Sequence, residues 1–176
     1  DIARFCGQRQ DIADLISLKN FANAEFCPRF IPGGEHLPGH GLDGSTVIIV
    51  STSSRNHSRN SLAMRTILAA RAARDNGADR VILVEPDLFY SAQDRGPRLE
   101  HGELDHARAG ADYSKFDGQP FSSRLYGDML RLAGVDTVVT VHNHSVSVAR
   151  EFQNQMAGFH NLLPAGLFAR YLVESK

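Results

Sequence analysis

The sequence predicts an α/β fold: a three-layer, mainly parallel sheet flanked by helices. Short apolar runs rich in valine and isoleucine occur at residues 46–50, 81–84 and 137–141, and a segment with helical spacing of apolar residues follows each run. Parallel strands need crossover connections, which helices supply. The alternation therefore favours a parallel sheet with helices on both faces.

The amino-terminal part of the chain predicts a strand, a helix and a hairpin. A strand is expected at residues 2–6 and a helix at residues 10–18, where apolar residues recur at helical spacing. Residues 24–30 predict a second strand, which Pro28 makes irregular or places at a sheet edge. Glycine-rich turns after it predict a β-hairpin near residues 28–44.

The rest of the chain continues the alternation. A long helix is expected at residues 61–76, and residues 87–118 are unusually polar for a compact domain. A further helix at residues 120–133 is expected to bury Phe121, Leu125, Met129, Leu130 and Leu132. The remaining elements are a helix at residues 145–155, a strand at 159–162 and a helix at 164–173.

Composition indicates a single soluble domain and excludes several functions. The 176 residues carry 19 lysines and arginines against 20 acidic residues, so no overall field favours nucleic acid or an anionic membrane. No apolar run is long enough to span a bilayer, and residues 1–4 do not resemble a signal peptide, so a cytoplasmic protein is expected. Cys6 and Cys27 are interpreted as two small buried thiols.

Polar side chains follow two of the predicted strands. Gln93, Asp94 and Arg95 come soon after the strand at residues 81–84, and His144 comes after the strand at 137–141. In an open α/β sheet, ligands bind beyond the carboxyl ends of the strands, so the two strand ends are expected to meet at one site. An amide, a carboxylate and a guanidinium in succession suit a nucleotide, although a solvated turn would have the same composition.

Histidines offer a possible metal site. His142 and His144 could bind one divalent cation only if the backbone between them stays extended, because alternate residues of a strand share a face. The alternative is that they face solvent at a strand end and help to cap the next helix. His101 and His106 lie among acidic residues, where a metal cluster and a solvated loop are both possible.

Several short motifs occur in order along the chain. They are Arg29-Phe30 with Gly34-Glu35, residues 47–52 before the helix containing Asn60, Tyr90-x-x-Gln93-Asp94-Arg95, Gly134-Val135-Asp136 to Thr140-x-x-x-His144, and Asn161-Leu162-Leu163-Pro164. In this order the chain resembles the amino-terminal domain of the ribose-phosphate pyrophosphokinases, also called phosphoribosyl pyrophosphate synthetases. The matching family motifs are RF-x-DGE, YARQDR, GADRVITxDLHA and DNLYASP, and the resemblance covers nearly the whole chain.

The resemblance implies one phosphoribosyltransferase-like domain over residues 1–176, the amino-terminal half of a two-domain synthetase whose carboxy-terminal domain is absent from this chain. Such enzymes transfer diphosphate from MgATP to the 1-hydroxyl of ribose 5-phosphate, which makes phosphoribosyl pyrophosphate for nucleotide biosynthesis. By this resemblance Gln93, Asp94 and Arg95 would bind ATP. His144 would act in catalysis near the triphosphate and its magnesium.

The resemblance also implies a role for a neighbouring subunit. Phe30 and Glu35 would reach the adenine of ATP bound to another copy of the chain, so a homo-oligomer, a dimer or a hexamer, is expected. His142, with His144, is the candidate for contact with Mg²⁺.

Three positions depart from the family pattern. Ala92 replaces the arginine of YARQDR, Gly33 stands where the hairpin has aspartate, and His142 replaces the aspartate two positions before the histidine. The first change removes a fixed cation beside a polyphosphate, and the last removes an oxygen ligand of the kind that magnesium prefers. Two interpretations follow: the amino-terminal half of an active synthetase, or a catalytically inactive synthetase-like regulatory or binding subunit. A small metal-dependent hydrolase that uses the histidines is a more remote third.

Overall fold

A single parallel sheet organises the structure. The computed structural model describes residues 16–98, 100–102 and 110–175. The sheet has four parallel strands in the order β3-β4-β5-β6, namely β3 (Thr46–Val50), β4 (Arg80–Val84), β5 (Thr137–Val141) and β6 (Gly158–Leu162). All four carboxyl ends therefore lie along one edge of the sheet, as the alternation of elements predicts.

Three helices form the crossovers between these strands. They are α2 (Arg59–Asp75), α4 (Ser122–Leu132) and α5 (Val146–Gln155). The hydroxyl of Ser58 accepts a hydrogen bond from the Ser61 amide at 3.1 Å and caps the start of α2. Asn76 ends this helix, and Gly77, with φ of 93°, turns the chain into β4.

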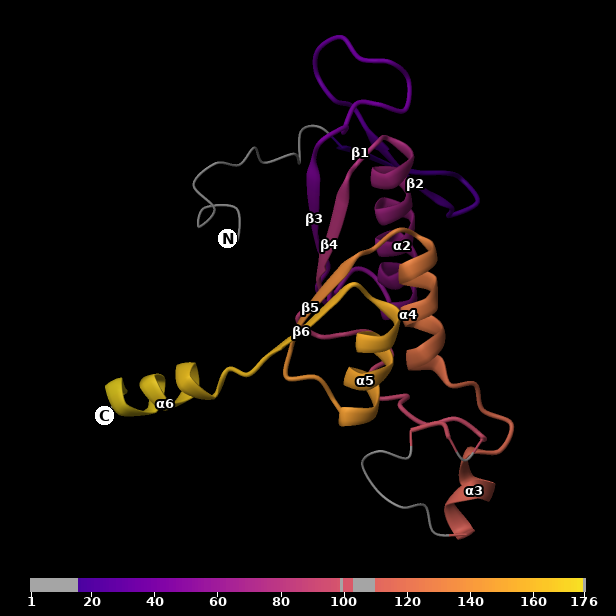
Figure 1. Cartoon of the computed structure of the whole chain (residues 1–176), viewed down its shortest axis with the longest axis vertical. Coiled ribbons are helices and arrows are strands. Elements are labelled where there is room, and N and C mark those ends of the chain that lie inside the picture. The colour runs from indigo at the N-terminus through magenta and orange to yellow at the C-terminus, as the bar shows by residue number, and fades with distance from the viewer. Residues whose placement is uncertain (1–15, 99, 103–109, 176) are drawn as a thin grey trace.

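The core lies between one face of the sheet and these helices. The helices α2, α4 and α5 lie to the same side of the strands, with α2 against α4 and α4 against α5 (Figure 1). Buried residues from strands and helices meet in this layer, including Val81, Leu83, Val138, Ala70, Leu130, Val148 and Phe152. The α/β class and the parallel sheet flanked by helices are thus confirmed, and the described residues supply the helical layer on one face.

The amino-terminal hairpin differs from its predicted position. Residues 16–18, expected in a helix, belong to β1 (Ile16–Asn20), which pairs antiparallel with β2 (Phe26–Phe30). The hairpin thus spans residues 16–30 rather than 28–44, and residues 31–45 form a loop with an isolated bridge from Asp43 to Ala78. Pairing with β2, a strand later in the sequence, decides the conformation of residues 16–18. Helical spacing of apolar residues over one turn does not indicate that pairing. The predicted strand at residues 2–6 lies outside the described residues.

Two expectations about burial are wrong. Leu125 and Leu132 of α4 are exposed, because the inward face of this helix is formed by Ser123, Tyr126 and Leu130. Cys27, interpreted as a buried thiol, is exposed on β2, and Cys6 lies outside the described residues.

The two remaining helices lie apart from the core. Helix α3 (Gly110–Phe116) forms within the polar segment, and α6 (Ala165–Glu174) follows β6 and has no buried residue. Figure 1 shows α6 extending away from the sheet. Among the described residues, no helix is both long enough and apolar enough to cross a membrane.

Candidate functional site

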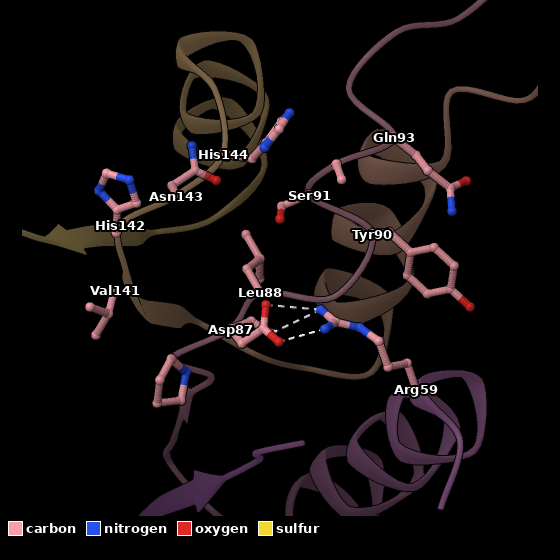
Figure 2. A pocket seen from close by; sticks show the side chains of 12 residues that line it. Arg59, Asp87, Leu88, Tyr90, Ser91, Gln93, Val141, His142, Asn143 and His144 are labelled. Atoms are coloured by element: carbon pink, nitrogen blue, oxygen red, sulfur yellow. Dashed lines mark hydrogen bonds and ion pairs between the residues drawn. The ribbon is translucent and has the colours of Figure 1, made fainter. Parts of the chain in front are cut away.

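A cavity of about 510 Å³ opens at the carboxyl edge of the sheet. Its walls come from the start of α2 and from the segments after β4 and β5. The lining residues are Arg59, Pro86, Asp87, Leu88, Tyr90, Ser91, Ala92, Gln93, Val141, His142, Asn143 and His144. Figure 2 shows the Arg59–Asp87 pair on one side of this cavity and His144 with Asn143 on the other. The predicted meeting of the two strand ends is therefore present, since Gln93 and His144 line the same space.

The segment after β5 leaves the extended conformation at once. His142 has φ of 52°, its amide donates to the Leu162 carbonyl at 2.9 Å, and the Asn143 amide donates to Oδ1 of Asn161 at 2.8 Å. Extended backbone, the condition for His142 and His144 to share a cation, is therefore not met. A left-handed backbone at a residue other than glycine costs free energy and is concentrated at functional sites.

The segment after β4 is also strained. Tyr90 has φ of 59°, and its hydroxyl donates to Oδ1 of Asn60 at 2.9 Å. The Gln93 amide donates to the Tyr90 carbonyl at 2.9 Å, which closes the turn that places Gln93 on the cavity wall. Asp94 and Arg95 lie just beyond this wall, and the Arg95 guanidinium lies 5.6 Å from the centre of the Phe116 ring.

Arg59 and Asp87 form a bidentate ion pair inside the cavity. Nη1 of Arg59 donates to Oδ2 of Asp87 at 2.5 Å, and Nη2 donates to Oδ1 at 3.0 Å. The Ser53 hydroxyl donates to the same carboxylate at 3.1 Å. Hydrogen bonding to Arg59 is the main cause that lowers the pKa of Asp87. The Arg59 guanidinium also lies 4.9 Å from the centre of the buried Phe89 ring.

A buried carboxyl lies directly beneath the cavity. Glu85 directly follows β4, is 0% exposed, and accepts hydrogen bonds from the Phe89 amide at 3.0 Å and from the Tyr126 hydroxyl at 3.1 and 3.2 Å. Burial raises the pKa of Glu85 to about 7, against the hydrogen bonds from Phe89, Tyr126 and Ser51 that favour the charged form. Burial likewise raises the pKa of Tyr126. The carboxyl therefore anchors the first turn of the cavity segment to α4.

The other predicted site residues lie elsewhere. Phe30 is buried in the core at the end of β2, and Glu35 lies exposed in the loop after it; neither lines the cavity. His101 stacks on Phe121 with 5.1 Å between ring centres, away from the cavity lining, and His106 lies outside the described residues. The polar loop thus brings no described histidine to His142 and His144.

The cavity does not fit a magnesium ion held by the protein alone. No group of three or more histidine, cysteine or carboxylate residues that could hold a metal occurs in the part of the chain that the structure describes. Among the described residues the lining has one carboxylate, Asp87, and it is bound to Arg59. Magnesium commonly binds to protein through few carboxylates and through the phosphates of a substrate, so the donors present suit an ion that arrives with a nucleotide.

Sequence patterns did not indicate three residues of the site. Arg59 and Asp87 line the cavity, and Glu85 supports it from below, yet none of them was singled out as a site residue. Asp87 comes three residues after the strand β4, and Arg59 begins the helix after β3, so their positions at strand ends were the available signal. Their pairing across 28 residues had no sequence signal.

Comparison with known proteins identifies the family. No family model matches the chain. A curated ribose-phosphate pyrophosphokinase from Methanopyrus kandleri is 31% identical over 159 residues, which cover 86% of this chain and 45% of that protein. The chain belongs to the ribose-phosphate pyrophosphokinase family. The resemblance drawn from the ordered motifs is thereby confirmed.

A solved member of this family shares the fold. The phosphoribosylpyrophosphate synthetase from Mycobacterium smegmatis superposes with a TM-score of 0.68 at 20% identity, over 93% of this chain and 46% of that one. This chain therefore spans about half the length of the pyrophosphokinase relatives that it matches. Its sheet and helices belong to the family fold.

Proposed function

We propose that this chain is the amino-terminal, nucleotide-binding half of a ribose-phosphate pyrophosphokinase. The whole enzyme transfers the diphosphoryl group of MgATP to ribose 5-phosphate and forms phosphoribosyl pyrophosphate. The observation that carries the proposal is that Gln93, His144 and the cationic Arg59 line one cavity. Diphosphoryl transfer asks the protein chiefly to position two substrates and to neutralise charge, and an amide, an imidazole and a guanidinium can do both.

Each family-derived residue has a proposed role. His144 acts at the triphosphate, and Gln93 contacts the nucleotide from the opposite segment. Asp94 and Arg95 follow Gln93 directly and serve the same nucleotide at the rim of the cavity. MgATP would bring its own magnesium, and of the two histidines His144 alone would lie beside it, because the backbone at His142 is not extended.

The proposal includes a homo-oligomer, a dimer or a hexamer. Glu35 is exposed in the loop after β2, where it is free to reach the adenine on a neighbouring subunit. Phe30 is buried beneath that loop, which favours its supporting the loop over its leaving the core. The exposed apolar side chains of α6, Leu167, Phe168, Tyr171 and Leu172, support association with another surface. Light scattering after size-exclusion chromatography measures the subunit number.

A second candidate function has its own observation. Ala92 and His142, two of the departures from the family motifs, both lie in the cavity lining. A chain with these residues could bind a nucleotide without transferring its phosphates. It would then act as a regulatory or binding subunit of a synthetase-like assembly.

The test uses the protein at its full encoded length. We expect it to form phosphoribosyl pyrophosphate from MgATP and ribose 5-phosphate, and we expect His144→Ala to abolish this reaction. His160→Ala is the matched control, because His160 is exposed on β6 and does not line the cavity. MgATP binding without product formation would favour the regulatory subunit. If MgATP failed to bind by titration calorimetry, both functions would be refuted.

A further inference from the structure

Arg59 is the only arginine or lysine that lines the cavity, as far as the described residues show. A site for a triphosphate needs positive charge, and the family motif's arginine is Ala92 here. Arg59 reaches the same cavity from a different element, the start of α2, so the chain keeps a guanidinium at this site despite the alanine. A planar guanidinium binds phosphate through two parallel hydrogen bonds, as it does a carboxylate.

In the structure this guanidinium is bound to the Asp87 carboxylate. Asp87 accepts from both terminal nitrogens of Arg59, at 2.5 and 3.0 Å, in the geometry that two phosphate oxygens would take. The pair is half exposed, with 49% of the Arg59 side chain and 58% of the Asp87 side chain accessible. Exposed ion pairs contribute little net stability. If a stronger ligand replaced Asp87 on Arg59, the free energy of unfolding would therefore change little.

The guanidinium has a second contact besides the carboxylate. It lies over the ring of Phe89, which is 0% exposed and fixed in the core, so one contact of Arg59 does not depend on Asp87. The Asp87 side chain is itself exposed, accepts one further hydrogen bond, from the Ser53 hydroxyl, and has water available when it leaves Arg59. The ion pair therefore has one anchored partner and one that can be displaced.

We propose that Arg59 binds a phosphoryl group of the substrate and that Asp87 is an internal competitor for the same guanidinium. On binding, the phosphate oxygens replace the two carboxylate oxygens, and Asp87 turns to solvent. This inference rests on the proposed nucleotide site and adds a residue to it. Because phosphate carries more charge than a carboxylate, it displaces Asp87, and the remaining repulsion from Asp87 weakens the affinity for polyphosphates.

The two halves of the pair should then have opposite effects on binding. We expect Arg59→Ala to weaken the binding of inorganic tripolyphosphate by about tenfold or more, the loss typical of a charged hydrogen bond. We expect Asp87→Asn to tighten it severalfold, since the amide competes less and carries no charge. The Arg71–Asp75 pair on the exposed part of α2, 2.5 Å apart, gives matched controls: Arg71→Ala and Asp75→Asn should change nothing.

Titration calorimetry of the chain and these four variants, with and without magnesium, decides the matter. Weaker binding in Asp87→Asn would overturn the proposal, because a structural pair or a magnesium ligand loses affinity when either partner is removed. Unchanged binding in Arg59→Ala, or no tripolyphosphate binding by the unmodified chain at millimolar concentration, would overturn it too. If MgATP binds normally while Arg59→Ala has no effect, this inference fails and the nucleotide site stands. If the opposite-sign pattern holds for tripolyphosphate but MgATP does not bind, the nucleotide proposal fails alone.

Discussion

Replacing Glu85 with glutamine should remove a pH dependence from the stability of the chain. The Glu85 carboxyl is fully buried beneath the cavity, and the groups that face it are the Phe89 amide, the Tyr126 hydroxyl, Ser51 and, at longer range, the Arg59 guanidinium. Glutamine has the same shape: its carbonyl can accept from the Phe89 amide, and its amide can donate to the Tyr126 oxygen. The substitution thus changes charge and little else.

The sign and size follow from the pKa of Glu85, which burial raises from 4.5 to about 7. Between these values the folded chain keeps a proton that the unfolded chain releases, so the free energy of unfolding falls as pH rises. The stabilisation is fully present below the unfolded value and is lost as pH passes through about 7. At about 1.4 kcal/mol per pH unit, the loss amounts to about 3 kcal/mol.

The assay is urea denaturation of the unmodified chain and of Glu85→Gln between about pH 5 and about pH 8, where most of this loss is expected. Comparing the two proteins at each pH cancels the contributions of the histidines. We expect the free energy of unfolding of Glu85→Gln to rise relative to the unmodified chain by about 2–3 kcal/mol across this range. A constant difference between the two proteins at every pH would refute the buried, proton-holding state of Glu85.

Three further substitutions test contacts beside the site and at the opposite edge of the sheet. Tyr126→Phe removes the hydroxyl that stabilises charged Glu85, so denaturation should show a loss of about 1–3 kcal/mol that is larger at high pH than at low pH; an equal loss at both would contradict this role. Arg74→Ala removes hydrogen bonds to the carbonyls at residues 78, 79 and 134 and an ion pair with Asp136, and should lower the free energy of unfolding by about 2–4 kcal/mol. A loss as small as that of a surface arginine would show that these contacts are not made. Gly102→Ala would place Cβ 2.1 Å from the backbone oxygen of Asp94 at a φ of 83°, so we expect a lower melting temperature and weaker MgATP binding; unchanged values would mean that this turn is not as described.

Local signals predicted most of the regular structure. The strands β3, β4 and β5 and the three crossover helices occur within two residues of their expected bounds. Each has a signal within its own residues: a run of β-branched side chains, a capping serine or a glycine stop. At residues 16–18 the signal was only one turn of helically spaced apolar residues, and the predicted helix is wrong. Pairing with Phe26–Phe30 decides the conformation there.

The sequence also predicted where the candidate site lies but not how it is built. The carboxyl ends of parallel strands must share an edge, so Gln93 and His144 could be placed at one cavity from element order alone.

Only the tertiary structure showed the Arg59–Asp87 pair and the buried Glu85 carboxyl. An ion pair between elements depends on the direction of two side chains, and a raised pKa depends on the solvent that all surrounding elements exclude. Neither feature is a property of a short stretch of chain. The motifs therefore predicted the family, and only the structure showed the ion pair and the raised pKa.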